Sequence, residues 1–463
     1  MFKKVATTVV VIAVVAGSAF ADAKNGGIAR EIAMGGSQAG SGLILNPFIM
    51  DDPAMLLLNP AYQSMYKDYA WMNIGGGTLN GLSTANNGYG QQNAGVAFSF
   101  GREWSLGAIL SYDPSAVNAV GTLLTGSGTL GLPPFVRRAG GAQSIPSVLN
   151  MWEVVAAYEA GSAKFGFGFM YGHSNNDSTA SVTGASGTSE ASAQVFGFRL
   201  GMNLDLGSGS SFDASAAIRL DKATDNVDFT PAPTTPINGD YSASVTEIQF
   251  QLRGKFKMSN KVNFVPYGLV AILSAEPKED AAPASLEAVP IGSDKVSGLA
   301  YAVGIGGEYK IPSFYLAGGI SVQSARAKVE INPPAPATGS TYTATYFALP
   351  VVNVGGEWWF TDWLAGRGGY YRSLGNVKFE SEGPTAGSST EGNHTIPNSF
   401  LFIGGITPFN NDGLVTLGLG FRFGGFALDA TVSEEALRRG LGLIGSQDNI
   451  NTFGYITTSY NFE

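Results

Sequence analysis

The chain has 463 residues and no cysteine. This absence excludes a disulfide framework, a thiolate metal site and a cysteine nucleophile. Histidine is nearly missing too, because His173 and His394 are the only two. Two histidines are too few for a histidine-rich metal cluster, so we expect no metal site and no cofactor.

Charge is also scarce. Charged residues make up 14% of the chain, against roughly 25% in an average soluble protein. The net charge is −9 and no basic cluster occurs, which argues against nucleic-acid binding. Glycine, with 63 residues, is by contrast abundant. Low charge combined with abundant glycine is unlike an ordinary soluble enzyme.

Long apolar runs are missing from most of the chain. Only the N-terminus, MFKKVATTVVVIAVVAGSAFADA, combines lysines, an apolar run from Val9 to Val15 and small residues. This pattern predicts a secretory signal peptide over residues 1–21, cleaved before Asp22; a retained anchor helix is the alternative. No later segment has the about 20 consecutive apolar residues that a transmembrane helix needs. We therefore expect an exported protein whose membrane insertion, if any, does not use helices.

What the chain does contain is alternation. In TEIQFQLRGKFK, residues 246–257, polar side chains from Glu247 onward fall on odd positions and large apolar ones on even positions. A period of two is typical of a strand, because successive side chains point to opposite faces. The same pattern recurs in VFGFRLGMNLDL, SFDASAAIRLD and TLGLGFRFGG. A soluble β-sandwich also alternates, but strands of about 9 to 13 residues fit a tilted membrane crossing.

The connections alternate between short and long. Short turns such as GRE (101–103) and GSGS (207–210) are followed by long connections such as 113–150 and 175–190. Short periplasmic turns with long external loops are typical of outer-membrane barrels, and a sheet in lipid must close on itself to satisfy its backbone. We therefore expect an all-β fold, a transmembrane antiparallel β-barrel over residues 67–463, in the outer membrane of a Gram-negative cell.

Strand counting predicts sixteen crossings. Seventeen segments alternate, and two of them, 398–406 and 414–423, are interpreted as one interrupted passage, because both chain ends should be periplasmic and the count even. The six tryptophans fall near predicted strand ends, which indicates an aromatic girdle. They are Trp71, Trp104, Trp152, Trp358, Trp359 and Trp363.

Two other segments do not alternate. Residues 22–66 read as short helical turns broken by Gly and Pro. They are too few to bury a core of their own, so we expect them to pack inside the barrel or under its mouth. SEEALRRGLGLIG, residues 433–445, predicts a short helix in the last loop with Ser433 as its N-cap.

The N-terminal segment resembles the FadL-like family of outer-membrane transport proteins, which includes a PorV-like branch. The matching residues are Ala29-Arg30, Met34-Gly35-Gly36, Asp51-Asp52-Pro53-Ala54 and Asn59-Pro60-Ala61. The resemblance implies a barrel of 14 strands plugged by an N-terminal hatch. It also implies passive uptake of hydrophobic molecules, such as long-chain fatty acids or hydrocarbons, with sideways exit through the wall at a kinked strand.

The hatch motif supplies the candidate gating residues, which are Asn59, Pro60, Ala61, Gly35 and Gly36. Asn59 offers two donors and an acceptor, while Pro60 fixes its φ and removes a donor. A plain turn that only stabilises the plug is the alternative interpretation.

Cations facing the barrel interior are the candidate ligand-binding residues, because a fatty acid needs a cation for its carboxylate. They are Arg199, Arg219, Arg253 and Lys255. The full set of interior charges expected from the alternation is Glu153, Arg199, Asp205, Asp213, Arg219, Asp221, Glu247, Arg253, Lys255, Arg422 and Asp429. These charges either form a polar path or fill the interior. The same alternation places Gly418 inward and Leu419 outward. Gly418→Ser is therefore expected to destabilise the barrel little and Leu419→Arg to destabilise it strongly.

Three functions remain open at this stage. The first is an uptake channel for hydrophobic small molecules. The second is a PorV-like secretion-pathway protein that binds exported proteins, and the third is a general polar porin. Expected partners are outer-membrane lipid, the hydrophobic ligand and, through the C-terminal strand, the barrel-assembly machinery. An enzyme is not expected: His173, Ser174 and Asp177 lie on one strand, where neighbours alternate faces.

Overall fold

The computed structural model describes residues 26–39, 42–75, 93–111, 151–182, 185–230, 239–281, 295–331, 339–382, 389–392, 413–432 and 453–462. The predicted signal peptide and the predicted helix over 433–445 lie outside these residues. No helix within them is long and apolar enough to span a bilayer, a finding that does not bear on strands.

The strands form one closed antiparallel barrel in which β19 pairs with β3. Their bounds are β3 Tyr69–Gly75, β4 Asn93–Phe100, β5 Trp104–Ser111, β6 Met151–Ala160, β7 Ala163–Val182, β8 Ala185–Gly207, β9 Ser210–Thr230, β10 Gly239–Lys257, β11 Val262–Ala281, β12 Lys295–Ile311, β13 Phe314–Ile331, β14 Ser340–Trp359, β15 Leu364–Glu382, β16 Ser389–Gly392, β17 Gly413–Phe423, β18 Phe426–Val432 and β19 Phe453–Asn461.

The count of sixteen passages is confirmed. β16 and β17 both pair antiparallel with β15, so together they form one interrupted passage. The second piece of the predicted passage, 414–423, is β17, whereas the predicted first piece, 398–406, lies outside the described residues. The fourteen strands implied by the family resemblance are not what the closed ring contains.

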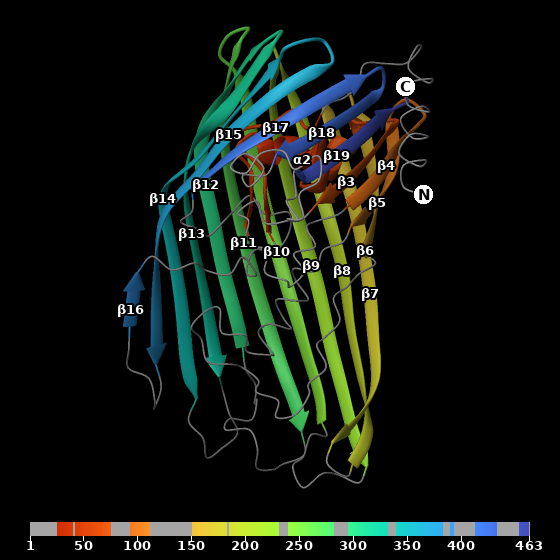
Figure 1. Ribbon diagram of the computed structural model, residues 1–463, viewed down its shortest axis with the longest axis vertical. Helices are drawn as coiled ribbons and strands as arrows, with labels where there is room; N and C mark the ends of the chain where they lie inside the picture. Colours follow the sequence, from red (N-terminus) through yellow and green to blue (C-terminus); the bar gives the residue numbers. More distant parts are fainter. Residues whose placement is uncertain are drawn as a thin grey trace, which may run out of the picture.

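The strands fall into two length classes, which Figure 1 shows as a tall and a low side of the barrel. β7 to β15 have 17 to 23 residues, whereas β3 to β6 and β17 to β19 have 7 to 11. The connection expected at 175–190 is mostly the paired end of β7 and β8. Alternation of apolar and polar residues ends there because the strands have left the lipid, but backbone pairing continues.

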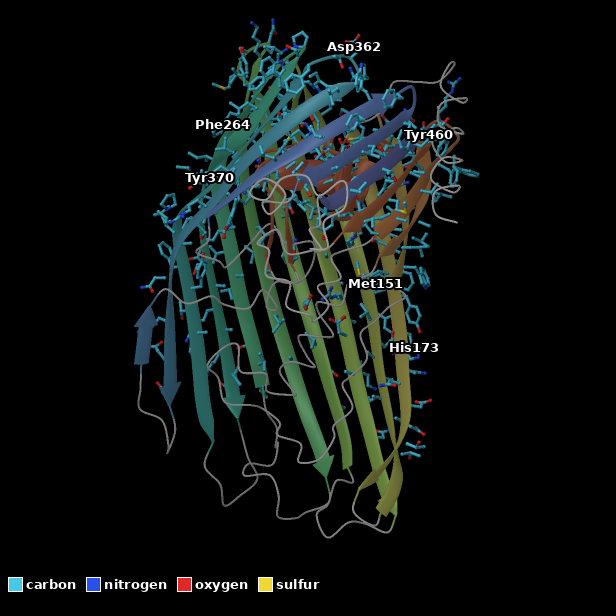
Figure 2. The ribbon with its side chains drawn as sticks, viewed as in Figure 1. Met151, His173, Phe264, Asp362, Tyr370 and Tyr460 are labelled. Atoms are coloured by element: carbon cyan, nitrogen blue, oxygen red, sulfur yellow. The ribbon has the colours of Figure 1, made fainter. Side chains whose placement is uncertain are left out.

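Large apolar side chains point outward over one section of each strand. Outward Phe167, Leu200 and Leu252 are 44%, 58% and 51% exposed. Figure 2 places Phe264 and Tyr370 on this outer surface, with Asp362 at the end of the short turns and His173 toward the other end. We call this section the apolar band. The apolar side chains therefore point outward, as the alternation predicted.

The expected interior charges mostly lie inside. Buried and inward-facing are Glu153, Arg199, Asp213, Arg219, Asp221, Glu247, Arg253 and Asp429. Lys255 and Arg422 are half-buried, and Asp205 is exposed at the end of β8. Of the tryptophans predicted to form a girdle, Trp104, Trp152, Trp358 and Trp363 are exposed, as a girdle requires, and Trp359 is half-buried. The prediction is wrong for Trp71, which is buried, stacks on Tyr69 and donates from Nε1 to Asn93.

Residues 26–66, which we call the N-terminal segment, hold α2 (Ile28–Ala33), the short pair β1 (Ser37–Ala39) and β2 (Gly42–Ile44), and the 3-10 helices η1 (Pro53–Leu57) and η2 (Pro60–Ser64). Every residue of α2 is buried. In Figure 1 this part of the chain lies within the barrel, toward the end with short turns.

Candidate functional site

The N-terminal segment is built on a turn that occurs twice. Asp52-Pro53-Ala54 opens η1 and Asn59-Pro60-Ala61 opens η2. In each, the first side chain caps the helix by accepting from the alanine N–H, at 2.7 Å for Asp52 and 2.9 Å for Asn59. Proline at the first helical position suits this geometry, because its φ is preset and its missing N–H is not needed. Both motif segments therefore have a local structural role.

Asn59 also reaches the barrel wall. Its Nδ2 donates to the carbonyls of Met202 in β8 and Ala214 in β9, both at 3.2 Å. The Asn59 side chain is completely buried. One amide thus caps η2 through its oxygen and ties η2 to the sheet through its nitrogen.

The remaining candidate gating residues, Gly35 and Gly36, make their contacts elsewhere in the segment. Gly35 has a φ of +83°, a conformation that glycine adopts without strain. Its carbonyl accepts from Asn353 Nδ2 at 2.8 Å. The N–H of Gly36 donates to the Glu31 carbonyl at 2.9 Å and closes the end of α2. The structure therefore does not bring these glycines together with Asn59.

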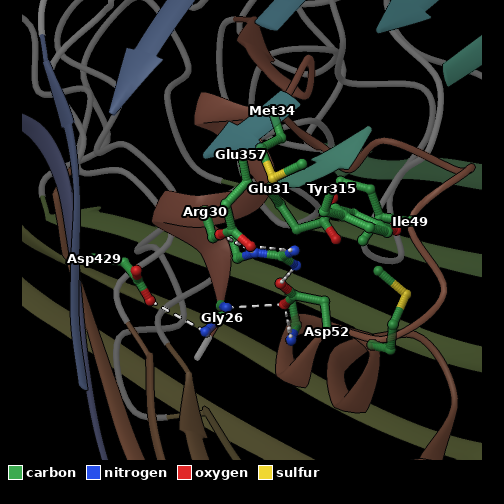
Figure 3. A network of polar contacts seen from close by, with 12 residues as sticks. Gly26, Arg30, Glu31, Met34, Ile49, Asp52, Tyr315, Glu357 and Asp429 are labelled. Atoms are coloured by element: carbon green, nitrogen blue, oxygen red, sulfur yellow. Dashed lines mark hydrogen bonds and ion pairs between the residues drawn. The ribbon is translucent and has the colours of Figure 1, made fainter. Parts of the chain in front are cut away.

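A buried network of charges anchors the start of the segment, as Figure 3 shows. Arg30 pairs with Asp52 at 2.8 Å and with Glu357 of β14 at 3.0 Å. Glu357 also binds Arg367 of β15 at 2.6 Å, and Arg367 binds Asp429 of β18 at 2.5 Å. Three strands and the segment are joined, and a buried ion pair of this kind is costly to break by removing one partner.

Asp52 is the centre of the segment's own contacts. Besides Arg30 and Ala54 it accepts from the N–H of Gly27 at 2.8 Å. Burial raises the pKa of Asp52, while Arg30 and the hydrogen bonds oppose the shift.

Glu31 is the least satisfied acid of the segment. It is completely buried, and its Oε2 accepts from the Asn46 N–H at 3.1 Å. Its Oε1 has no hydrogen-bond partner among the described residues. Burial raises the pKa of Glu31 well above its usual range; Asp52 adds to the shift, and Arg30 and Arg253 oppose it.

Three of the four predicted ligand-binding cations contact the N-terminal segment. Arg199 pairs with Glu153 at 2.6 Å and donates to the Leu56 carbonyl at 3.2 Å. Arg253 pairs with Asp213 at 3.0 Å.

The remaining contacts of these cations follow the same pattern. Arg253 also donates to the Ile49 carbonyl and to the Tyr62 hydroxyl, both at 3.3 Å. Lys255 pairs with Asp51 at 3.0 Å. The fourth cation, Arg219, pairs with Asp221 and Glu247 of the wall. All four cations already face carboxylates.

Glycines in the wall make room for the segment's backbone. A Cβ on Gly166 would lie 2.2 Å from Ala61 N, and one on Gly201 would lie 2.0 Å from Asn59 Oδ1. A Cβ on Gly355 would lie 2.1 Å from the Met34 carbonyl oxygen. These glycines lie at inward positions of β7, β8 and β14. The sequence signal was present, as glycine on the polar face, but the partner across the barrel could not be read from it.

The interior of the tall side is apolar where the outside is polar. On β11, inward Leu273 and Ala275 are 5% and 3% exposed, while the outward Ser274 and Glu276 are exposed. The apolar interior residues of these strands include Ala223, Val245, Leu269, Leu273, Ala275, Val296, Ala300, Ala302, Ala327, Val329 and Ala348. They form one buried cluster with Phe48, Met55 and Tyr62 of the N-terminal segment. We call this set the apolar interior. Some of its members, such as Ala302, lie opposite the apolar band, whereas others, such as Val296 and Val329, lie beyond it. Sequence reasoning missed the latter because the alternation inverts there.

A family model described as outer membrane protein beta-barrel domain matches residues 153–352, which run from β6 to β14. No curated protein matches the sequence. Distant structural similarity exists to the Pseudomonas putida toluene transporter TodX, at 11% identity and a TM-score of 0.36, over 96% of this chain and 100% of that one. The ferric yersiniabactin uptake receptor FyuA of Yersinia pestis is similar at 9% identity and a TM-score of 0.34, over 81% of this chain and 70% of that one.

The described residues therefore form a closed antiparallel β-barrel of the outer-membrane type, with the N-terminal segment packed against its inner wall.

Proposed function

We propose that this protein is an outer-membrane channel for passive uptake of hydrophobic small molecules, with the N-terminal segment as its hatch. The observation that carries the proposal is the apolar interior. Side chains such as Val296 and Val329 face inward where the outward neighbours, among them Lys295 and Lys328, are already polar, so lipid does not explain them. A sugar porin has a polar interior, whereas a site for an apolar ligand has apolar walls.

The paired cations favour uncharged ligands within that class. A fatty-acid carboxylate would need a cation, yet Arg199, Arg219 and Arg253 each face a carboxylate at 3.3 Å or less. Displacing one of these partners would leave a buried charge unpaired, which is costly. Hydrocarbons need no such exchange, so we propose them as better substrates than fatty acids.

The exit is proposed to be sideways, beside β15. The β14–β15 register shifts between Ala348 and Val351, and on the other edge the partner of β15 changes from β16 to β17. A bulge interrupts a ladder locally, so both edges of β15 offer a place where the wall could part.

Uptake tests the proposal directly. Cells producing the protein should accumulate a radiolabelled aromatic hydrocarbon faster than cells without it. Ala302→Asp puts a charge into the apolar interior and should reduce the uptake rate several-fold, while Ser297→Asp, on the outer face of the same strand, should not. Heat-modifiable migration in gels checks that both variants fold.

Three results would contradict the proposal. Swelling of proteoliposomes by sugars would indicate a porin. Co-purification of an exported protein, with no hydrocarbon uptake, would indicate the secretion role. Equal uptake by Ala302→Asp and Ser297→Asp would remove the apolar interior from the pathway.

The sideways exit has its own test, because the chain has no cysteine. Cysteines at Phe347 and Asn376, which are register partners with exposed side chains, are close enough to bond across neighbouring strands. The oxidised Phe347→Cys/Asn376→Cys protein should take up hydrocarbon slowly and recover on reduction. Thr343→Cys/Glu380→Cys, farther along the same pair, is the control and should show no redox effect.

A further inference from the structure

The outer wall of β12 to β15 carries cations directly beyond the apolar band. On β12 the outward residues run from Leu299 through Ser297 to Lys295, and on β13 Ser324 is followed by Arg326 and Lys328. On β15 the exposed Leu374 and Asn376 are followed by Lys378. We call Lys295, Arg326, Lys328 and Lys378 the cationic patch.

On this arc several such cations lie together. Elsewhere Lys222 on β9 also follows the band, but its register partners on β8 and β10 are Gln194 and Ser244. The acids of the same faces, Glu330 on β13 and Glu380 on β15, come one outward position after the lysines. On β8 and β11 the first ionisable residue beyond the band is instead an acid, Glu190 or Glu276. Positive charge next to the band is therefore concentrated on one arc of a protein whose net charge is −9.

The register brings the patch together. Arg326 pairs with Leu299 on one side and with Thr345 on the other, and Thr345 pairs with Lys378. Arg326 and Lys378 are thus two strand spacings apart, or roughly 9.5 Å between Cα atoms. Thr345, which carries a hydroxyl, lies between them in the register. Below this row the band continues with Tyr301 and Phe347, which are 41% and 48% exposed.

All four side chains of the patch are at least partly exposed. Arg326 is exposed and has no carboxylate partner among the described residues. Lys378 lies 2.7 Å from Glu380, but both side chains are nearly half exposed, and Lys328 contacts Glu330 in the same way. Exposed pairs of this kind contribute little and exchange readily. A guanidinium beside an ammonium suits phosphate, since its planar donors bind two oxygens.

We propose that the cationic patch binds a phosphorylated glycolipid of the outer leaflet. The acyl chains would lie on Leu299, Tyr301 and Phe347, and a sugar phosphate would lie on Arg326 and Lys378 with the Thr345 hydroxyl between them. The long ends of the strands face outside, because the short turns of a barrel are periplasmic. The proposal depends on this orientation and not on what the channel transports.

Binding to purified lipid A tests the proposal. The folded mature protein in non-ionic detergent is titrated with bisphosphorylated lipid A and with dephosphorylated lipid A, and native mass spectrometry counts the bound lipid. A cation at an anionic lipid surface contributes roughly fivefold in affinity. Arg326→Gln/Lys378→Gln should therefore bind the bisphosphorylated lipid at least about tenfold more weakly. Lys257→Gln/Lys261→Gln removes the same charge at the short-turn end and should bind like the parent protein.

Four results would overturn the proposal. One is equal binding of both double variants, and another is binding of dephosphorylated lipid A as tightly as the phosphorylated form. A third is equal, equally mutation-sensitive binding of phosphatidylglycerol, which would indicate a general response to anionic bilayers. A fourth is full competition by millimolar inorganic phosphate, which would indicate a free-phosphate site. If the double variant does not fold, Arg326→Lys replaces it in the experiment. This variant keeps the charge, so it should lose only part of the affinity for lipid A.

Discussion

At the residue scale, Asn59 links local structure to the wall. Its oxygen caps η2 and its nitrogen binds two carbonyls of the sheet, Met202 in β8 and Ala214 in β9. Few side chains can supply an acceptor and two donors at once. The requirement for asparagine here therefore follows from two separate sets of contacts.

Asn59→Ala removes both sets, and we expect it to weaken docking of the N-terminal segment by about 1–3 kcal/mol, since a buried polar contact is lost. Asn59→Asp keeps the cap but places a carboxylate against two carbonyl oxygens, so it should weaken docking more. Limited proteolysis of residues 26–66 measures docking, and hydrocarbon uptake measures gating. Unchanged values for both variants would leave Asn59 without a gating role.

Glu31 predicts a pH dependence. Its pKa is higher in the folded protein than in the unfolded chain because of burial, so the folded state holds its proton more tightly. Its contribution to stability is fully present below the unfolded pKa of about 4.3. The contribution is lost as the pH rises toward the folded value. The charged groups around it are Asp52, Arg30 and Arg253.

Glu31→Gln should flatten this dependence. Between pH 4 and pH 8 the protease resistance of the N-terminal segment should fall in the parent protein and change less in the variant. Its amide oxygen can still accept from the Asn46 N–H. Identical pH profiles would show that the carboxyl does not titrate in the folded protein.

At the element scale, glycines in the wall let the backbone of the N-terminal segment approach it closely. The inward glycines of β7, β8, β14 and β15 lie where a Cβ would strike its backbone, as at Gly166, Gly355 and Gly369. The expectation that Gly418→Ser is mild is therefore wrong: a Cβ there would lie 2.5 Å from the Ala33 Cβ and 2.8 Å from the Ala430 carbonyl oxygen.

Gly355 and Gly356 make a matched pair for this role. A Cβ on Gly355 would meet the Met34 carbonyl oxygen at 2.1 Å, whereas one on Gly356 would meet nothing closer than 3.7 Å. Gly355→Ala should displace the segment and raise both proteolysis and leakage of large antibiotics. Gly356→Ala should leave both close to the parent value. Equal effects would mean that close contact with the wall does not hold the segment.

At the scale of the whole molecule, the long strands have two sections with opposite facing. Within the apolar band, large apolar side chains point out and charges point in. Farther along the same strands, polar side chains point out and apolar ones such as Val296 and Val329 point in. The barrel therefore serves as a membrane wall in one section and as the wall of an external vestibule in the next.

Two positions on the outer face of β10 test where the band ends. Leu252 lies within it, whereas Ser244 lies eight residues farther along, beyond the last apolar outward residue. Leu252→Arg should destabilise the folded barrel by about 2–4 kcal/mol, as arginine does at the bilayer midplane. Ser244→Arg should cost about 0–1 kcal/mol. Urea titration in lipid vesicles measures both, and equal costs would contradict the assigned boundary.

The alternation of side chains by itself determined the barrel class, the outward and inward faces and the sixteen passages. It could do so because the bilayer imposes one polarity rule on every crossing. For the same reason, the short turns predicted from the sequence agree closely with the structure. At the other end the sequence predicts strands that are too short, since beyond the lipid that rule no longer applies and pairing alone maintains the strand.

Only the tertiary structure decided what the buried charges do. Arg199, Arg253 and Lys255 appear in the sequence as inward cations that could hold a carboxylate ligand. Their partners come from other strands or from the N-terminal segment, as Asp213 of the neighbouring β9 and the Leu56 carbonyl do. The same is true of Glu357, which joins Arg30 to Arg367. Local periodicity sets which way a side chain points, but closure of the barrel around the segment sets what it meets.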